Sequence, residues 1–219
     1  MTGPSWEQRE GQHPHLCAET AALDLYWIPL GAGAHVVRAS GMGYERLSAL
    51  VQHRSPQDLY HSALVAVVDG VSVVIEMTPI PDTRGRMDRG VVAEGPVGWR
   101  PAGRLRLFRY EIRRWSGGII PDLDSAVGSP VQLTSEAALV NQALALVPSV
   151  PTPVWGRDEL SAGEMWNSNS VVAWVLTRTG LHANACQPPN HGRAPGWDAG
   201  VTVAERQMTE VEITSRVAS

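Results

Sequence analysis

Lysine is absent from this sequence, because all 18 basic residues among the 219 are arginine. With 22 acidic residues the formal net charge is -4. The protein therefore lacks the overall positive charge that would indicate binding of a nucleic acid. Cysteine is nearly absent too, since only Cys17 and Cys186 occur. Two cysteines do not make a disulfide framework or a cysteine-ligated zinc site, and we expect no metal ion and no cofactor.

Long apolar runs are also missing. None approaches the roughly 20 residues that cross a bilayer, and residues 1–19 lack the apolar core of a secretory signal. These absences predict a soluble, cytoplasmic protein without a membrane span. The hydrophobic content of 43% suffices for one domain with a sizeable core. We expect a disordered arm at residues 1–22, a single domain at 23–204 and a frayed tail at 205–219.

The pattern of apolar residues predicts an α+β fold built on an antiparallel sheet. Residues 23–30, 59–68, 71–78, 91–93 and 104–115 are typical of strands. The arginines between residues 100 and 114 alternate with apolar residues, which indicates a strand with one solvated face rather than a nucleic-acid groove. Helices are predicted from residue 134 or 135 to 147 and from 168 to 180. The Gly/Pro-rich residues 188–200 predict a loop, and 201–203 a last strand.

Asp69-Gly70 lies between two β-branched runs and is a strong hairpin signal. If these two residues form the turn, paired positions follow from Val68 opposite Val71. His61 then lies opposite Thr78 and shares a face with Glu76, near enough for the side chains to meet. Either Thr78 or Glu76 would be placed to assist His61. A slip of one residue would separate His61 from Glu76, so the inference depends on the turn.

Residues 164–176 carry the main functional signal, Glu-Met-Trp-Asn-Ser-Asn-Ser followed by an apolar run. Asn and Ser are preferred amino-terminal caps, so a helix is predicted to begin at about Ser168. A nucleophile at that position would lie at the positive end of the helix dipole, which stabilises a developing anion. The alternative is that Asn-Ser-Asn-Ser is a cap and nothing more.

The order Asn, nucleophile, two polar residues and two apolar residues resembles the N-C-x-x-F-V segment of circularly permuted papain-like proteins. These belong to the NlpC superfamily, which includes lecithin retinol acyltransferase. The segment is also similar to uncharacterised bacterial members that carry N-S-N-[ST]-F-V. The resemblance implies a permuted papain-like fold, puts Ser168 at the position of the family's cysteine, and requires a strand histidine upstream, for which His61 is the candidate.

These residues suggest a Ser-His-Glu site that hydrolyses or transfers the acyl group of an amide or ester. Ser168 would be the nucleophile, His61 the general base and Glu76 the group that orients it. Ser168 is preferred to Ser170 because Val172 and Leu176 lie on its side of the helix. Serine in place of cysteine departs from the family. A catalytically inactive module that binds a small molecule or peptide, and a purely structural cap, therefore stay open.

Loop tryptophans and charges on both sides of the helix are candidates for contact with a small-molecule or peptide substrate. The loop at 188–200 is either a surface excursion or a cover over the site. The expected substrate-binding residues are Trp155, Arg157, Asp158, Trp166, Asn167, Asn169, Arg193 and Trp197.

Overall fold

The computed structural model describes residues 20–30, 53, 55–80, 90–120, 123–128 and 130–217. Within these ranges the chain forms a six-stranded antiparallel sheet and three α-helices, confirming the α+β class. The strands lie in the order β4-β5-β3-β2-β1-β6. Their bounds are β1 Ala21–Pro29, β2 Tyr60–Val68, β3 Val71–Pro79, β4 Val91–Pro96, β5 Arg109–Ser116 and β6 Val131–Thr134.

The helices follow the sheet in the chain. They are α2 Ala137–Leu146, α3 Ser168–Thr179 and α4 Trp197–Val217. Short 3-10 turns connect the elements: η1 Arg100–Arg104, η2 Arg106–Phe108, η3 Leu123–Ser125, η4 Val147–Ser149, η5 Ala183–Ala185 and η6 Pro189–His191. The expected arm at 1–22 lies, up to residue 19, outside the described residues.

The β2–β3 hairpin has the predicted register, with Val68 opposite Val71 and Leu64 opposite Ile75. Asp69 and Gly70 both have positive φ, at 50° and 78°. Two consecutive positive φ values are the requirement of a type I′ turn, whose twist matches that of the flanking strands. The Asp-Gly pair therefore sets which β2 and β3 side chains share a face.

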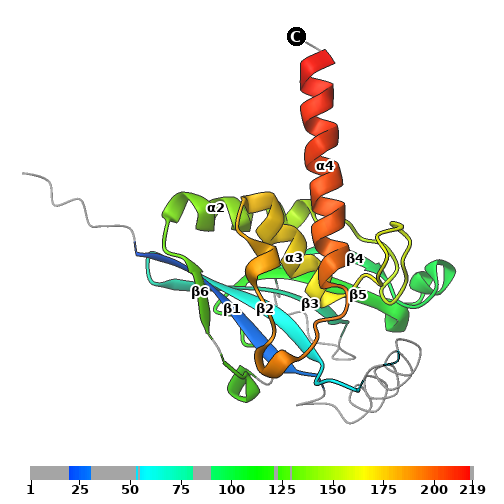
Figure 1. Cartoon of the computed structure of the whole chain (residues 1–219), viewed down its shortest axis with the longest axis horizontal. Helices are drawn as coiled ribbons and strands as arrows, with labels where there is room; N and C mark the ends of the chain where they lie inside the picture. The colour runs from blue at the N-terminus through cyan, green and yellow to red at the C-terminus, as the bar shows by residue number, and fades with distance from the viewer. Residues whose placement is uncertain are drawn as a thin grey trace, which may run out of the picture.

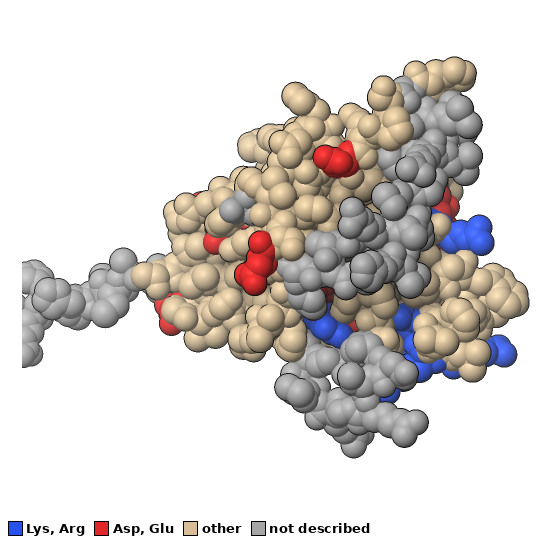
Figure 2. Space-filling model, turned by 90° about the horizontal axis from the view of Figure 1, so that it is seen from below, with Lys and Arg blue, Asp and Glu red and all other residues tan. Residues whose placement is uncertain are grey.

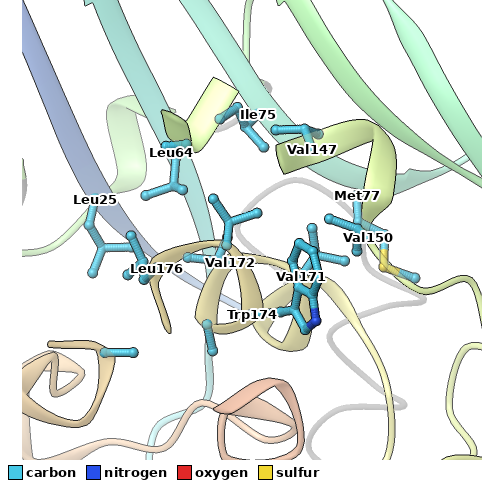
Figure 3. Packing of buried hydrophobic residues seen from close by; sticks show 14 of the residues in the cluster. Leu25, Leu64, Ile75, Met77, Val147, Val150, Val171, Val172, Trp174 and Leu176 are labelled. Carbon is cyan, nitrogen blue, oxygen red and sulfur yellow. The ribbon is translucent and has the colours of Figure 1, made fainter. Parts of the chain in front are cut away.

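Helices α2 and α3 cover one face of the sheet, and α4 packs on α3 (Figure 1). The predicted inward residues Val172, Val175 and Leu176 are buried. Figure 3 shows Val172 and Leu176 directed at Leu25 and Leu64 of the sheet. The opposite sheet face has its own smaller core, formed by Ile28, Ala63, Val74 and Ile120. Both faces of the central strands are therefore apolar.

Helix α4 is the largest departure from the sequence prediction. The structure has one helix where a loop end, a strand at 201–203 and a frayed tail were expected. Gly200 allows the close approach to α3, since a Cβ there would lie 2.2 Å from the Ser170 carbonyl oxygen. Val201 and Ala204 are buried, whereas the second half of α4 projects away from the domain (Figure 1). Packing on α3 thus overrides the helix-breaking tendency of glycine.

The segment between β4 and β5 also differs from the prediction. Residues 104–108 were expected to extend a strand, but the strand begins at Arg109 and two 3-10 turns precede it. Pro101 and Gly103 lie inside the first turn and favour it over an extended strand.

Candidate functional site

Helix α3 begins at Ser168, as predicted, with a complete amino-terminal cap. The Asn167 side-chain oxygen accepts the backbone N–H groups of Asn169 at 2.9 Å and Ser170 at 3.4 Å. In return the Ser170 hydroxyl accepts the N–H of Asn167 at 3.0 Å. This is a capping box, which satisfies orphan donors at both ends of the first turn.

The loop before α4 is held against this cap. Asn167 Nδ2 donates to the Pro195 carbonyl at 2.7 Å, and the Ser170 hydroxyl donates to the Gly196 carbonyl at 2.7 Å. The Glu164 carboxylate accepts the Gly196 N–H at 2.8 Å. Gly196 has φ of 83°, and a Cβ there would lie 2.7 Å from Asn167 Oδ1. The loop is therefore a cover packed on the start of α3.

Asn169 connects this cap to β2. Its Nδ2 donates to the Tyr60 and Pro195 carbonyls, both at 3.0 Å. Its Oδ1 accepts the Ser62 hydroxyl at 2.9 Å. Both amide hydrogens and the acceptor are thus used inside the protein, which leaves Asn169 little capacity for a substrate.

Ser168 itself is buried beside this network. Helical spacing places Ser168 on the side of the helix that carries Val172 and Val175. Only 8% of its surface is exposed. Its hydroxyl has no hydrogen-bond partner among the described residues. A serine needs a base within hydrogen-bond reach to become a nucleophile, so the position of His61 decides what Ser168 can do.

His61 and Glu76 share one face of the sheet, as the hairpin register requires. Because Ser62 reaches α3, strand alternation turns His61 to the opposite face. His61 is paired with Ile28, whose side chain belongs to the core on that second face. Val74, two residues before Glu76, belongs to the same core.

Glu76 is held by an arginine on that second face. Arg113 lies 3.1 Å from Glu76 and 2.9 Å from Glu111, and all three residues are buried. Burial raises the pKa of Glu76, and Arg113 opposes that shift. Thr78 has the same strand parity and therefore also faces away from α3.

The structure does not bring Ser168, His61 and Glu76 together. The expectation that Ser168 faces His61 is corrected: Ser62 is the β2 residue whose side chain meets the start of α3. The reason is that β2 is apolar on both faces, so its sequence does not indicate which face the helix covers. The correct register therefore put His61 and Glu76 on the same face, but it did not tell which face of the sheet that is.

Three further expected substrate-binding residues are buried in the protein or bonded to other parts of it. Trp197 is buried, its ring centroid lies 5.0 Å from that of Trp27, and its Nε1 donates to Ala183. Trp166 is also buried, and its indole N–H has no partner among the described residues. Arg193 lies 3.8 Å from Glu164 and its backbone bonds to the start of β2.

Arg157 and Asp158 line a cavity of about 450 Å³, together with Gly98, Trp99, Arg100, Val154 and Glu159. We call this the Trp99–Arg157 cleft. A second cavity of about 540 Å³ adjoins it and shares Arg100 and Glu159. Neither lining includes Arg193 or Trp197, so a pocket shared by Arg157, Asp158 and Arg193 among the loop tryptophans stays a prediction. Trp155 packs edge-on against Tyr110, at 5.8 Å between centroids.

The charged side chains of the Trp99–Arg157 cleft differ in how far they are hydrogen-bonded within the protein. Arg100 binds Glu159 through two nitrogens, at 2.6 and 3.2 Å. Asp158 accepts the N–H groups of Ala162 and Gly163. Arg157 Nε donates to the Gly98 carbonyl at 2.9 Å, and no partner among the described residues binds its terminal nitrogens.

Cys186 and the potential metal ligands of the described residues add no second site. Burial raises the pKa of the Cys186 thiol, which keeps it protonated and weakly nucleophilic. Among the described residues no three His, Cys, Asp or Glu side chains are placed to hold a metal ion. No helix in that part of the chain is long and apolar enough to cross a membrane.

Comparison with family models, with curated proteins and with solved structures gave no match.

Sequence reasoning missed Ser62 and Glu164, which complete the network around the cap. Ser62 is a single polar residue between Tyr60 and Leu64 on the inward face of β2, and that interruption was the available signal. Glu164 had no comparable signal, because its partner Gly196 lies 32 residues later in the chain.

Proposed function

We propose that this protein is a catalytically inactive module that binds a small molecule or short peptide with a carboxylate in the Trp99–Arg157 cleft. The observation that carries the proposal is the hydrogen bond between Ser62 and Asn169, because strand alternation then turns His61 to the face of the sheet opposite Ser168. On this proposal the likeness of residues 167–172 to the papain-like motif reflects a shared helix start and not a shared nucleophile.

The composition of the cleft supports this ligand class. Arg157 offers terminal guanidinium nitrogens, and a guanidinium matches a carboxylate in two parallel hydrogen bonds. Trp99 is largely exposed at the same cavity and offers an apolar plane. Glu159 is neutralised by Arg100 and so repels an incoming anion less. A volume of about 450 Å³ falls in the range of small-molecule sites.

Lack of catalysis is tested with a fluorophosphonate probe on the folded protein. We expect no labelling above that of Ser168→Ala, because no base among the described residues is hydrogen-bonded to the Ser168 hydroxyl. Labelling that disappears in both Ser168→Ala and His61→Ala would contradict the proposal.

Ligand binding is tested by NMR titration with acetyl-Ala-Ala-Phe, as the free acid and as the carboxamide. The acid should shift the amide signals of Gly98, Trp99 and Arg157, and bind about tenfold more tightly than the carboxamide. Arg157→Gln should remove that preference, whereas Arg178→Gln, on α3 beside Trp174, should keep it. Equal binding of acid and carboxamide, or shifts confined to other regions, would exclude the cleft as the site.

A further inference from the structure

The segment Trp99–Arg109 gathers exposed apolar side chains in one place; we call it the basic excursion. Trp99, Leu105, Leu107 and Phe108 are 66%, 62%, 78% and 42% exposed. Large apolar side chains gathered on a surface mark an interaction site, since each would be more stable out of water. The fold does not need these side chains, because none of the residues in η1 or η2 is buried.

The basic excursion contains four arginines and no acidic residue. At its two ends Arg100 pairs with Glu159, and Arg109 pairs with Glu94. Between them the side chains of Arg104 and Arg106 have no partner among the described residues. Two unneutralised guanidinium groups therefore alternate with Leu105 and Leu107, two exposed aliphatic residues of the segment.

The position of the basic excursion leaves it accessible. It connects the edge strand β4 to β5, and Figure 1 shows its green coil beyond these two strands. Since the sequence has no lysine, the blue atoms in Figure 2 are arginine, and on this face of the molecule they gather toward one side. The basic excursion thus combines exposed apolar side chains with arginines in one short segment.

We propose that the basic excursion docks the protein on a membrane surface that contains anionic lipids. Leu105 and Leu107 enter the boundary between headgroups and acyl chains, and Arg104 and Arg106 contact the lipid phosphates. Aliphatic tips flanked by arginine suit this boundary, where Trp99 also finds its preferred environment. A nucleic acid is less suited, because the exposed side chains that alternate with Arg104 and Arg106 are Leu105 and Leu107, which are aliphatic and offer no plane for base stacking.

The test is sedimentation of the full chain with vesicles of phosphatidylcholine alone or with a quarter phosphatidylserine. We expect binding to the phosphatidylserine vesicles only, weakened by salt. The double variant Arg104→Gln/Arg106→Gln should bind these vesicles about 25-fold more weakly, because each lost charge weakens binding about fivefold. Leu105→Ser with Leu107→Ser should weaken it at least about tenfold. The matched control is Ile119→Ser, which removes an equally exposed apolar side chain outside the excursion.

Two outcomes would overturn the proposal. One is absence of binding to the phosphatidylserine vesicles, or binding that both double variants leave unchanged. The other is that the same side chains serve a partner other than a membrane. This result would be tight binding of oligo-dT, or a dimer in sedimentation velocity, if the double variants abolish it. Arg157 lies outside the variants, so the peptide titration of the Trp99–Arg157 cleft can succeed or fail independently of this result.

Discussion

Asn169 joins three parts of the chain at the start of α3, because its side-chain amide bonds to β2 and to the loop before α4. Its sequence neighbours Asn167 and Ser170 bind the same loop. The polar run that resembles a nucleophile motif is thus fully engaged in holding the fold, apart from the Ser168 hydroxyl.

We expect Asn169→Ala to lower the free energy of unfolding by about 3 kcal/mol, because it leaves the Ser62 hydroxyl and the Tyr60 carbonyl unsatisfied in the interior. The control Asn184→Ala removes an exposed amide and should change it by less than about 0.5 kcal/mol. Urea denaturation followed by circular dichroism measures both. Equal effects would show that the network contributes little.

Arg113 lies between two buried carboxylates on the other face of the sheet. Arg113→Met should cost about 3–5 kcal/mol of stability at pH 7, because Glu76 and Glu111 would lose their shared cation. Glu76→Gln keeps the Arg113–Glu111 pair, and we expect a change within about 1 kcal/mol. The same denaturation experiment compares them. A larger loss in Glu76→Gln than in Arg113→Met would contradict this assignment.

Burial raises the pKa of Glu76 above its usual 4.5, and burial likewise raises the pKa of Glu164. The unfolded chain therefore ionises first as pH rises. The stability from the protonated carboxyl is fully present below pH 4.5 and is lost as pH rises through the folded-state pKa. As pH rises above 4.5, Glu76→Gln should become more stable relative to the wild type, measured by urea denaturation. A constant or declining difference would contradict the raised pKa.

At the scale of elements, local signals predicted some parts of the fold and not others. The Asp69-Gly70 turn defines its own register, and the Asn167 cap defines where α3 begins, since both act within a few residues. Helix α4 depends on contacts with α3, which local propensity does not contain. The turns η1 and η2 replaced an expected strand for a related reason, since alternating Arg and Leu indicates a strand only when one face is covered.

Gly200→Ala tests the packing of α4 on α3. A Cβ would lie 2.2 Å from the Ser170 carbonyl oxygen and 2.9 Å from the Ala173 Cβ, so the helices must separate. We expect a loss of about 2 kcal/mol despite the higher helix propensity of alanine. Glu205→Ala, at an exposed position of α4, should stay within about 0.5 kcal/mol in the same thermal and urea unfolding. A stabilised Gly200→Ala would mean that the two helices do not pack this closely.

At the scale of the whole molecule, the decisive feature is a sheet with an apolar core on each face. The hairpin register predicted that His61 and Glu76 share a face, but nothing in β2 tells which face carries α3, because Ala63 and Val65 are as apolar as Leu64 and Ala66. Placing α3 against Ser62 separates Ser168 from His61, and we therefore propose the Trp99–Arg157 cleft as the site for a ligand.

The most direct test of this account is a carbon-edited NOESY spectrum of the protein in solution. The structure predicts contacts between Ser62 and Asn169, which are hydrogen-bonded, and between the His61 ring and the side chain of its cross-strand partner Ile28. Contacts of the His61 ring with Ser168 or Val172 would place the histidine on the α3 face, contradict the separation and return the serine-hydrolase hypothesis to first place.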